Sequence, residues 1–161
     1  MKISAWVVNL RLDHSAAWAN LYTLWFEDLT GRNSVVTRNG RLRWVGDEPS
    51  ARLLVDELPG LVVDEEEPAL FDVIQVRNDL TYQTSGSEMR VLNCLSFLDD
   101  LILQQEVAIP DGHISTMDQI IFRLTVGESL NELYDAVGGV SKVVELLDWQ
   151  IERVVSASFL D

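Results

Sequence analysis

Few residues of this sequence have the types and the spacing that catalysis or metal binding requires. The two histidines, His14 and His113, have no second His or Cys one helical turn away, so they cannot form a structural zinc site. Cys94 falls on an apolar helix face, which indicates a core residue rather than a nucleophile. The nucleophile-elbow, phosphate-loop and dinucleotide-binding motifs are absent. The sequence therefore predicts no catalytic residue, no metal ligand and no cofactor, and we expect a protein that is not an enzyme.

Carboxylates are the remaining groups with possible acid–base chemistry. Asp99 and Asp100 are neighbours in a predicted helix, so their side chains diverge by about 100°. A general acid and a general base must lie at positions that only the folded structure defines. The acidic run at residues 64–67 is a predicted loop, so its sequence alone does not identify such a pair. A hydrolase whose carboxylates meet only in the folded chain is therefore the alternative from another functional class.

The charge of the chain is strongly negative and unevenly distributed. The 161 residues include 12 basic and 26 acidic side chains, a formal net charge of −14. Residues 1–46 hold six basic and three acidic residues, a net charge of +3, whereas residues 47–161 hold six basic and 23 acidic ones, a net charge of −17. A polyanion repels phosphates, so nucleic acid is disfavoured as a direct partner. The same charge favours a basic protein as the partner.

Six residues are candidates for contact with such a partner: Glu65, Glu66, Glu67, Glu145, Trp149 and Glu152. The three consecutive glutamates lie in a run of like charge, which predicts a solvated loop. In the predicted last helix, Trp149 projects opposite the apolar face, within the polar strip that holds the other two glutamates. A large aromatic side chain among acids is typical of an interface anchor. The alternative is that another element, such as the acidic loop or the N-terminal sheet, covers Trp149.

The N-terminal half mixes strand and helix patterns. Alternating residues predict a strand over 3–12, and Asn39-Gly40 predicts a hairpin over 35–45 with Arg38, Arg41 and Arg43 on one face. We expect this cationic face to pair with carboxylates of this chain, and an acidic partner or a phosphate is the alternative. The remaining expectations are an aromatic-faced helix from about 15 to 30, a short helix from Pro49 to Leu58, a brief strand at 61–63, and a helical turn running into a strand over 69–82.

The C-terminal half is predicted to be helical around one central helix. Ser85 and Glu88 have capping-box spacing, and apolar residues cover most of the helix that follows to Gln105. Further helices are expected at 115–127, from a Ser115 cap, at 129–138, from a Ser129 cap, and at 140–158. The prediction is a single α+β domain spanning residues 1–161, in which a small antiparallel sheet from the N-terminal half packs on a mainly helical C-terminal half.

These observations favour an acidic protein-binding module. Immunity proteins and antitoxins are small, acidic, single-domain proteins that neutralise a basic toxin or nuclease, and electrostatic capture of that kind is our leading hypothesis. The nearest alternative is an acidic secretion chaperone, which holds an extended effector segment in apolar grooves. Charged residues interrupt every apolar run well before the ~18 residues of a membrane span, and Met1 is not followed by the pattern of a secretory signal. We therefore expect a cytoplasmic protein with no membrane partner.

Overall fold

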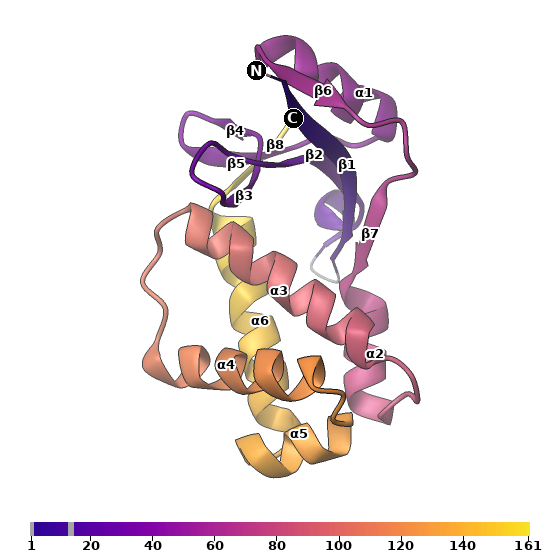
Figure 1. Cartoon of the computed structure of the whole chain (residues 1–161), viewed down its shortest axis with the longest axis vertical. Coiled ribbons are helices and arrows are strands. Elements are labelled where there is room, and N and C mark those ends of the chain that lie inside the picture. The colour runs from indigo at the N-terminus through magenta and orange to yellow at the C-terminus, as the bar shows by residue number, and fades with distance from the viewer. Residues whose placement is uncertain (1, 13–14) are drawn as a thin grey trace.

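The structure is a computed structural model that describes residues 2–12 and 15–161 (Figure 1). Its larger sheet is mixed, with the long strand β1 near its centre. The strands, in spatial order, are β3 (Asn33–Val35), β2 (Leu21–Glu27), β1 (Ile3–Arg11) and, along the other edge of β1, β6 (Leu61–Val63) followed by β7 (Ala69–Asp72). The first three strands are antiparallel, whereas β6 and β7 run parallel to successive parts of β1.

The alternating sequence of β1 forms the predicted strand because both faces of the sheet are covered. Val8 and Leu10 belong to the main core, which the helices share, and Ala5 and Val7 belong to a second, smaller core. Helix α1 (Glu48–Leu53) and the 3-10 turn that follows it, η2 (Leu54–Glu57), cover this second core. Period-two alternation with apolar residues on both sides is the pattern that such a two-sided strand requires.

The expected aromatic-faced helix at residues 15–30 is wrong. Residues 21–27 of this segment form the strand β2, which pairs with β1 over six residues, after a short 3-10 turn at Ala16–Trp18 (η1). Its residues Leu-Tyr-Thr-Leu-Trp-Phe are aromatic or otherwise common in strands, and pairing with β1 overrides the three- and four-residue spacing. Both faces of β2 contribute to a core, since Leu21 belongs to the main core and Leu24 to the second.

The hairpin at Asn39-Gly40 is confirmed and gains a third strand. Strands β4 (Thr37–Arg38) and β5 (Arg41–Trp44) are antiparallel, and Asn39 and Gly40 have φ values of 53° and 76°. The tail of the chain forms β8 (Ser158–Leu160), which runs parallel to β5. The buried indole of Trp44 donates a hydrogen bond of 2.9 Å to the Ser158 hydroxyl. No pattern in the sequence predicted β8, and this segment was expected to end the last helix.

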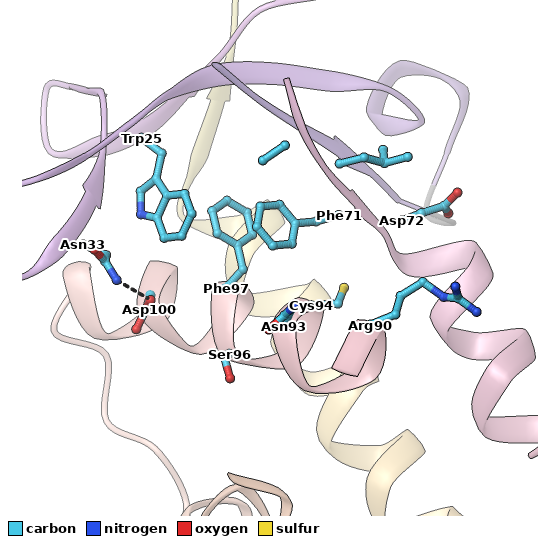
Figure 2. A pocket seen from close by; sticks show the side chains of 12 residues that line it. Trp25, Asn33, Phe71, Asp72, Arg90, Asn93, Cys94, Ser96, Phe97 and Asp100 are labelled. Atoms are coloured by element: carbon cyan, nitrogen blue, oxygen red, sulfur yellow. Dashed lines mark hydrogen bonds between the residues drawn. The ribbon is translucent and has the colours of Figure 1, made fainter. Parts of the chain in front are cut away.

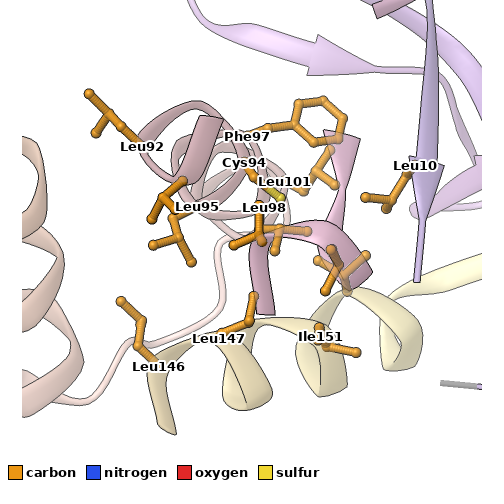
Figure 3. Packing of buried hydrophobic residues seen from close by; sticks show 14 of the residues in the cluster. Leu10, Leu92, Cys94, Leu95, Phe97, Leu98, Leu101, Leu146, Leu147 and Ile151 are labelled. Atoms are coloured by element: carbon orange, nitrogen blue, oxygen red, sulfur yellow. The ribbon is translucent and has the colours of Figure 1, made fainter. Parts of the chain in front are cut away.

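The central helix is confirmed as α3 (Glu88–Gln104), and it packs against α2, α4, α6, β3 and β7. Figure 3 shows Leu98 and Leu101 of α3 between Leu10 of β1 and the buried face of α6 (Val140–Ser156). The helix starts at Glu88, so the predicted capping box at Ser85 is wrong. The N-cap is Ser87, whose hydroxyl bonds the Thr84 carbonyl at 2.7 Å.

The other helices lie in segments predicted to be helical at least in part, and two of them begin elsewhere than predicted. They are α2 (Val73–Tyr82), α4 (Asp111–Thr125) and α5 (Leu130–Val137). The predicted Ser129 cap is confirmed as a complete capping box with Glu132. Helix α4 begins four residues before the predicted Ser115 cap, directly after Pro110. The expected order within 69–82 is wrong, because the strand β7 comes first and Asp72 then caps α2 by accepting the Gln75 N–H at 3.1 Å.

The α+β fold class is confirmed. The strands lie at one end of the molecule in Figure 1 and the helices α4 and α5 at the other, whereas α3 and α6 lie between, with α6 leading up to β8 in the sheet region. Both sheets are mixed rather than purely antiparallel, because β6, β7 and β8 join parallel to their neighbours. Within the described residues, no helix is both long enough and apolar enough to cross a membrane.

Candidate protein-binding site

The three glutamates of the acidic run lie in the loop between β6 and β7, as predicted, and all three are exposed. Arg52 of α1 holds this loop by donating to the backbone carbonyls of Asp64 at 3.1 Å and Glu66 at 3.2 Å. No ion pair joins the side chains of Glu65, Glu66 and Glu67 to any residue in the described part of the chain. Their charges are therefore displayed to solvent beside the sheet.

Trp149 is half-buried on α6 and packs against the main core. Its ring centroid lies 5.0 Å from that of His113, near the start of α4, so another helix covers the side chain that the sequence placed on a polar strip. Glu145 and Glu152 on the same helix are exposed, and Glu145 lies 3.9 Å from the Lys142 ammonium. This arrangement matches the alternative in which Trp149 is covered.

The two groups of candidate residues are not brought together. The acidic loop lies beside β1 and α1 at the sheet end of the molecule, whereas α4 and the α6 segment that carries Trp149 lie in the helical part (Figure 1). A single patch made of Glu65–Glu67 and the α6 residues does not exist, so each group can contribute only separately to a partner surface.

Two of the three arginines on the hairpin face, Arg38 and Arg43, pair with carboxylates of this chain, as expected. Arg43 is buried and bonds the carboxylates of Glu57 and Asp161, the latter at 2.6 Å. Arg38 lies 3.8 Å from the same Asp161 carboxylate. Arg41 is exposed and donates only to the Ser156 carbonyl, at 3.3 Å, so among the described residues this face keeps one arginine without a carboxylate partner.

A groove lies between the larger sheet and α3, where neither element covers the other completely. Its cavity volume is about 670 Å³. Figure 2 shows Trp25 of β2, Phe71 of β7 and Phe97 of α3 meeting there. Phe71 and Phe97 stack with centroids 4.0 Å apart, and Trp25 meets the two rings edge-on at 5.9 and 5.5 Å. Trp25 and Phe71 remain partly exposed, so the groove has an aromatic wall that is accessible from outside.

Strand β7 contributes its whole length to the groove. All four residues, Ala69 to Asp72, line it, although successive side chains of a strand point to opposite faces. The groove also includes Trp25 of β2 and Asn33 of β3, on the other side of β1 from β7, so it follows α3 across the sheet rather than the edge of one strand. Within the described residues β7 pairs with β1 alone, and beyond that ladder no hydrogen bond involves Ala69, Leu70 or Phe71. Leu70 is 51% exposed.

The groove also has charged walls, of which Asp100 is the least neutralised. Arg90 at one end is held by the buried carboxylate of Asp79, at 2.7 and 3.0 Å. Asp72 caps α2 and lies 3.7 Å from Arg11. Asp100 accepts a bond of 3.4 Å from the Asn33 amide. Burial raises the pKa of Asp100 above its ordinary value, and this hydrogen bond offsets part of the increase.

A second hollow continues the groove past Asn33 and Asp100, which line both. It has a cavity volume of about 550 Å³ and lies between the β2–β3 turn and the C-terminal end of α3. Its walls carry the half-exposed Leu103, the carboxylates of Asp28 and Glu106, and one cation, Arg32. The two hollows together form a track along α3, apolar at one end and more acidic at the other.

The groove has no signature in any one stretch of the sequence, because its walls come from β2, β3, β7 and α3. One signal for it was present, since Asn93, Ser96, Asp100 and Gln104 form the narrow polar stripe of an otherwise apolar central helix. The first three of these residues line the groove, and Gln104 lines the second hollow and bonds the backbone of Val35 at 2.9 and 2.8 Å. When other elements pack on most of a helix surface, the narrow polar stripe identifies the face that no element covers.

The described side chains include neither a metal-binding group nor a reactive thiol. Within residues 2–12 and 15–161, no three His, Cys, Asp or Glu side chains are grouped as a metal ion would require. His14 lies outside the described residues. Cys94 lines the groove but is 1% exposed, and burial, with a smaller contribution from Asp72, raises the pKa of its thiol to about 12. Such a thiol is protonated at neutral pH and is a poor nucleophile.

Comparison with known proteins identifies a similar fold and no family. No protein-family model matches the chain, and no curated protein matches it. Among solved structures, the chain is similar to the crystal structure of the SatS C-terminal domain in complex with bromine, at 14% sequence identity and a TM-score of 0.57. The match covers 98% of this chain and 94% of that one. The likeness therefore concerns the fold alone, and this chain has the same α+β architecture as the SatS C-terminal domain.

Proposed function

We propose that this protein is an acidic protein-binding module that captures a basic segment of a partner protein in the groove between β7 and α3. The observation that carries the proposal is the combination, in one groove, of an accessible aromatic wall with the Asp100 carboxylate. Aromatic side chains supply most of the affinity at protein interfaces, and charge complementarity selects the partner.

Electrostatic attraction supports capture of a basic partner. The net charge of −14 creates a long-range field that steers a cation towards the molecule, and salt weakens this field over a Debye length of about 8 Å at physiological ionic strength. In this role Glu65, Glu66 and Glu67 are steering charges, because their side chains lie exposed beside the sheet that carries the groove. Glu145 and Glu152 add to the field from α6.

The geometry of the groove favours binding of an extended segment over binding of a folded toxin domain. A basic toxin or nuclease domain, blocked by an immunity protein or antitoxin, presents a folded surface, which a broad acidic face fits best. A groove that follows α3 from Arg90 to Gln104 fits an extended segment better. A chaperone-type role, in which the module holds an unfolded stretch of a secreted protein, is therefore the second candidate, and the groove is the observation that favours it.

The test uses a fluorescein-labelled octapeptide of alternating valine and lysine as the probe, with binding measured by fluorescence anisotropy. We expect binding that weakens strongly between low ionic strength and about 150 mM salt, because steering charges are screened. Asp100→Asn removes the groove carboxylate and should weaken binding by about tenfold, the order expected for a charge-assisted contact.

Asp135→Asn is the matched control. Asp135 is an exposed carboxylate on α5, outside the groove, and the substitution changes the net charge of the protein by the same amount. It should alter the affinity less than twofold at physiological salt, where distant charges are screened. Equal effects of the two substitutions would show that the peptide senses only net charge, and the groove would then lose its role.

A further inference from the structure

The carboxylate of Asp100 is partly buried, and no cation of the described chain neutralises it. It accepts one hydrogen bond, of 3.4 Å, from the Asn33 amide, and within residues 2–12 and 15–161 it forms no ion pair. Arg90 on the same helix is ten positions away, about 15 Å at about 1.5 Å per residue, and Asp79 holds it. A carboxylate that is partly removed from water without a cation is costly, so a cation supplied by a ligand is stabilised here.

Asn33 and Asp100 together present more hydrogen-bond acceptors than their own contact uses. The Asn33 amide nitrogen donates to Oδ2 of Asp100. Oδ1 of Asp100 and the side-chain carbonyl oxygen of Asn33 accept no hydrogen bond from any described residue. A guanidinium carries five N–H donors in a planar fork and can bond several acceptors at once, whereas an ammonium is a compact point charge. This pair of side chains therefore fits a guanidinium better than an ammonium.

Trp25 provides an aromatic surface beside these acceptors. Figure 2 shows Trp25, Asn33 and Asp100 at the same end of the groove. Trp25 pairs with Val35 in the ladder of β2 and β3, so it lies on the same face of the sheet as Asn33, two residues before Val35. Its partly exposed indole is held by edge-on contacts with the two phenyl rings of the groove. Tryptophan attracts cations more strongly than other aromatic side chains, and a guanidinium can stack on it while its N–H groups bond acceptors.

We propose that this end of the groove is a binding site for one arginine side chain of the partner, whose guanidinium bonds Asp100 and Asn33 and stacks on Trp25. This inference rests on the proposed function and specifies its ligand, a segment with an arginine at this position rather than any basic residue. Lysine supplies the charge but lacks the planar fork, and citrulline has a similar planar shape but no charge.

Three peptides that differ in one side chain test this site. Each is a fluorescein-labelled octapeptide in which valine alternates with glutamine, and one central glutamine is replaced by arginine, lysine or citrulline. Binding is measured by fluorescence anisotropy at low ionic strength. We expect the arginine peptide to bind about tenfold more tightly than the citrulline peptide and about threefold or more tightly than the lysine peptide, because only a guanidinium combines the charge with the fork.

Substitutions in the protein assign these preferences to the groove. Asp100→Asn removes the carboxylate and should reduce the difference between the arginine and citrulline peptides to less than about twofold. Asn33→Ala removes the second acceptor and should reduce the preference for arginine over lysine. Asp135→Asn, on α5 outside the groove, should leave both preferences unchanged. Circular dichroism checks that each variant is folded.

An NMR titration with a small probe locates the guanidinium. N-acetyl-arginine methylamide should shift the resonances of the Trp25 indole N–H, assigned from Trp25→Phe, and of the Asn33 side-chain amide. The citrulline analogue should leave both resonances unchanged. Shifts confined to other residues would overturn the arginine site.

The peptide results separate this inference from the function on which it rests. If the arginine and lysine peptides bind equally, while the valine–lysine octapeptide still binds in a manner that depends on salt and on Asp100, the arginine site is overturned and the protein-binding module stands. The arginine site also falls if the preference for arginine over citrulline persists in Asp100→Asn. A lack of salt-dependent binding by every basic peptide, including the valine–lysine octapeptide, overturns both.

Discussion

The ion pair between Arg90 and Asp79 joins α2 to α3 at one end of the groove and permits a quantitative prediction. The Asp79 carboxylate is fully buried, and it accepts bonds from Arg90 at 2.7 and 3.0 Å and from Gln75 at 3.0 Å. Burial raises the pKa of Asp79, but the bonds from Arg90 and Gln75 outweigh it, so the pKa lies below its ordinary value. Arg90→Ala would leave a buried carboxylate with Gln75 as its main donor.

The expected cost of Arg90→Ala is about 3 kcal/mol in the free energy of unfolding. Removing one partner of a buried pair costs about 3–5 kcal/mol, and the 47% exposure of the Arg90 side chain places this pair at the low end of that range. Urea unfolding followed by circular dichroism measures the difference. Arg32→Ala is the control, since this exposed arginine pairs with no carboxylate in the described residues, and the cost should be below about 0.5 kcal/mol.

The loss of stability caused by Arg90→Ala should depend on pH, and the pKa of Asp79 gives the direction of this dependence. In the wild type the lowered pKa of Asp79 adds stability above the ordinary pKa of about 3.9, and this stability is lost as the pH falls through the folded-state value. In Arg90→Ala the effect of burial prevails, so the folded-state pKa rises above the ordinary value and the carboxyl gains a proton earlier. The cost of the substitution should therefore shrink between pH 7 and about pH 4.5.

Two results would refute this reasoning. One is a cost for Arg90→Ala that is no larger than that for Arg32→Ala at neutral pH. The other is a cost that grows on acidification. As a further check, adding Asp79→Asn to Arg90→Ala should recover part of the lost stability, because a neutral amide is less costly to bury than an unpaired charge.

Three other predictions concern single residues. The Cys94 thiol should resist a disulfide reagent in the native protein and react fully in denaturant, because burial raises its pKa to about 12; rapid labelling of native protein would contradict this. Ser129→Ala should lower the free energy of unfolding by about 1 kcal/mol through loss of the cap bond to the Glu132 N–H, and Ser129→Asp should retain stability; equal urea midpoints would argue against it. Trp149→Ala should lower stability by about 2 kcal/mol, since the indole packs on the core and on His113, without changing the peptide affinity; weaker binding at unchanged stability would make Trp149 an anchor after all.

Two local signals in the sequence were reliable because one short segment determines the structure, whereas the caps expected at Ser85 and Ser115 were wrong. Asn39-Gly40 predicted its hairpin because both residues adopt φ > 0, and Ser129 predicted its helix because the cap and Glu132 bond each other directly. Segment 15–30 misled because its spacing fits a helix and its aromatic and Thr content fits a strand. Only the pairing partner, β1, decides between the two.

The groove could not have been predicted in the same way. Trp25, Phe71 and Phe97 are far apart in the sequence, and each alone resembles a core residue. The acidic run was correctly placed in an exposed loop, but the position of Trp149 depended on α4, which covers it through His113. Helical periodicity defines the direction in which a side chain points and says nothing about which element it meets.

The parallel pairing of β5 with β8 has a consequence for the synthesis of this chain. Trp44 and Ser158, which bond each other across these strands, are 114 residues apart. A ribosome that adds about 5–20 residues per second needs roughly 6–23 s to make that stretch. Throughout this interval the hairpin of a nascent chain carries an unpaired outer strand, which is open to neighbouring chains on the same messenger. We therefore expect misassembly to be most frequent before residues 158–160 leave the ribosome.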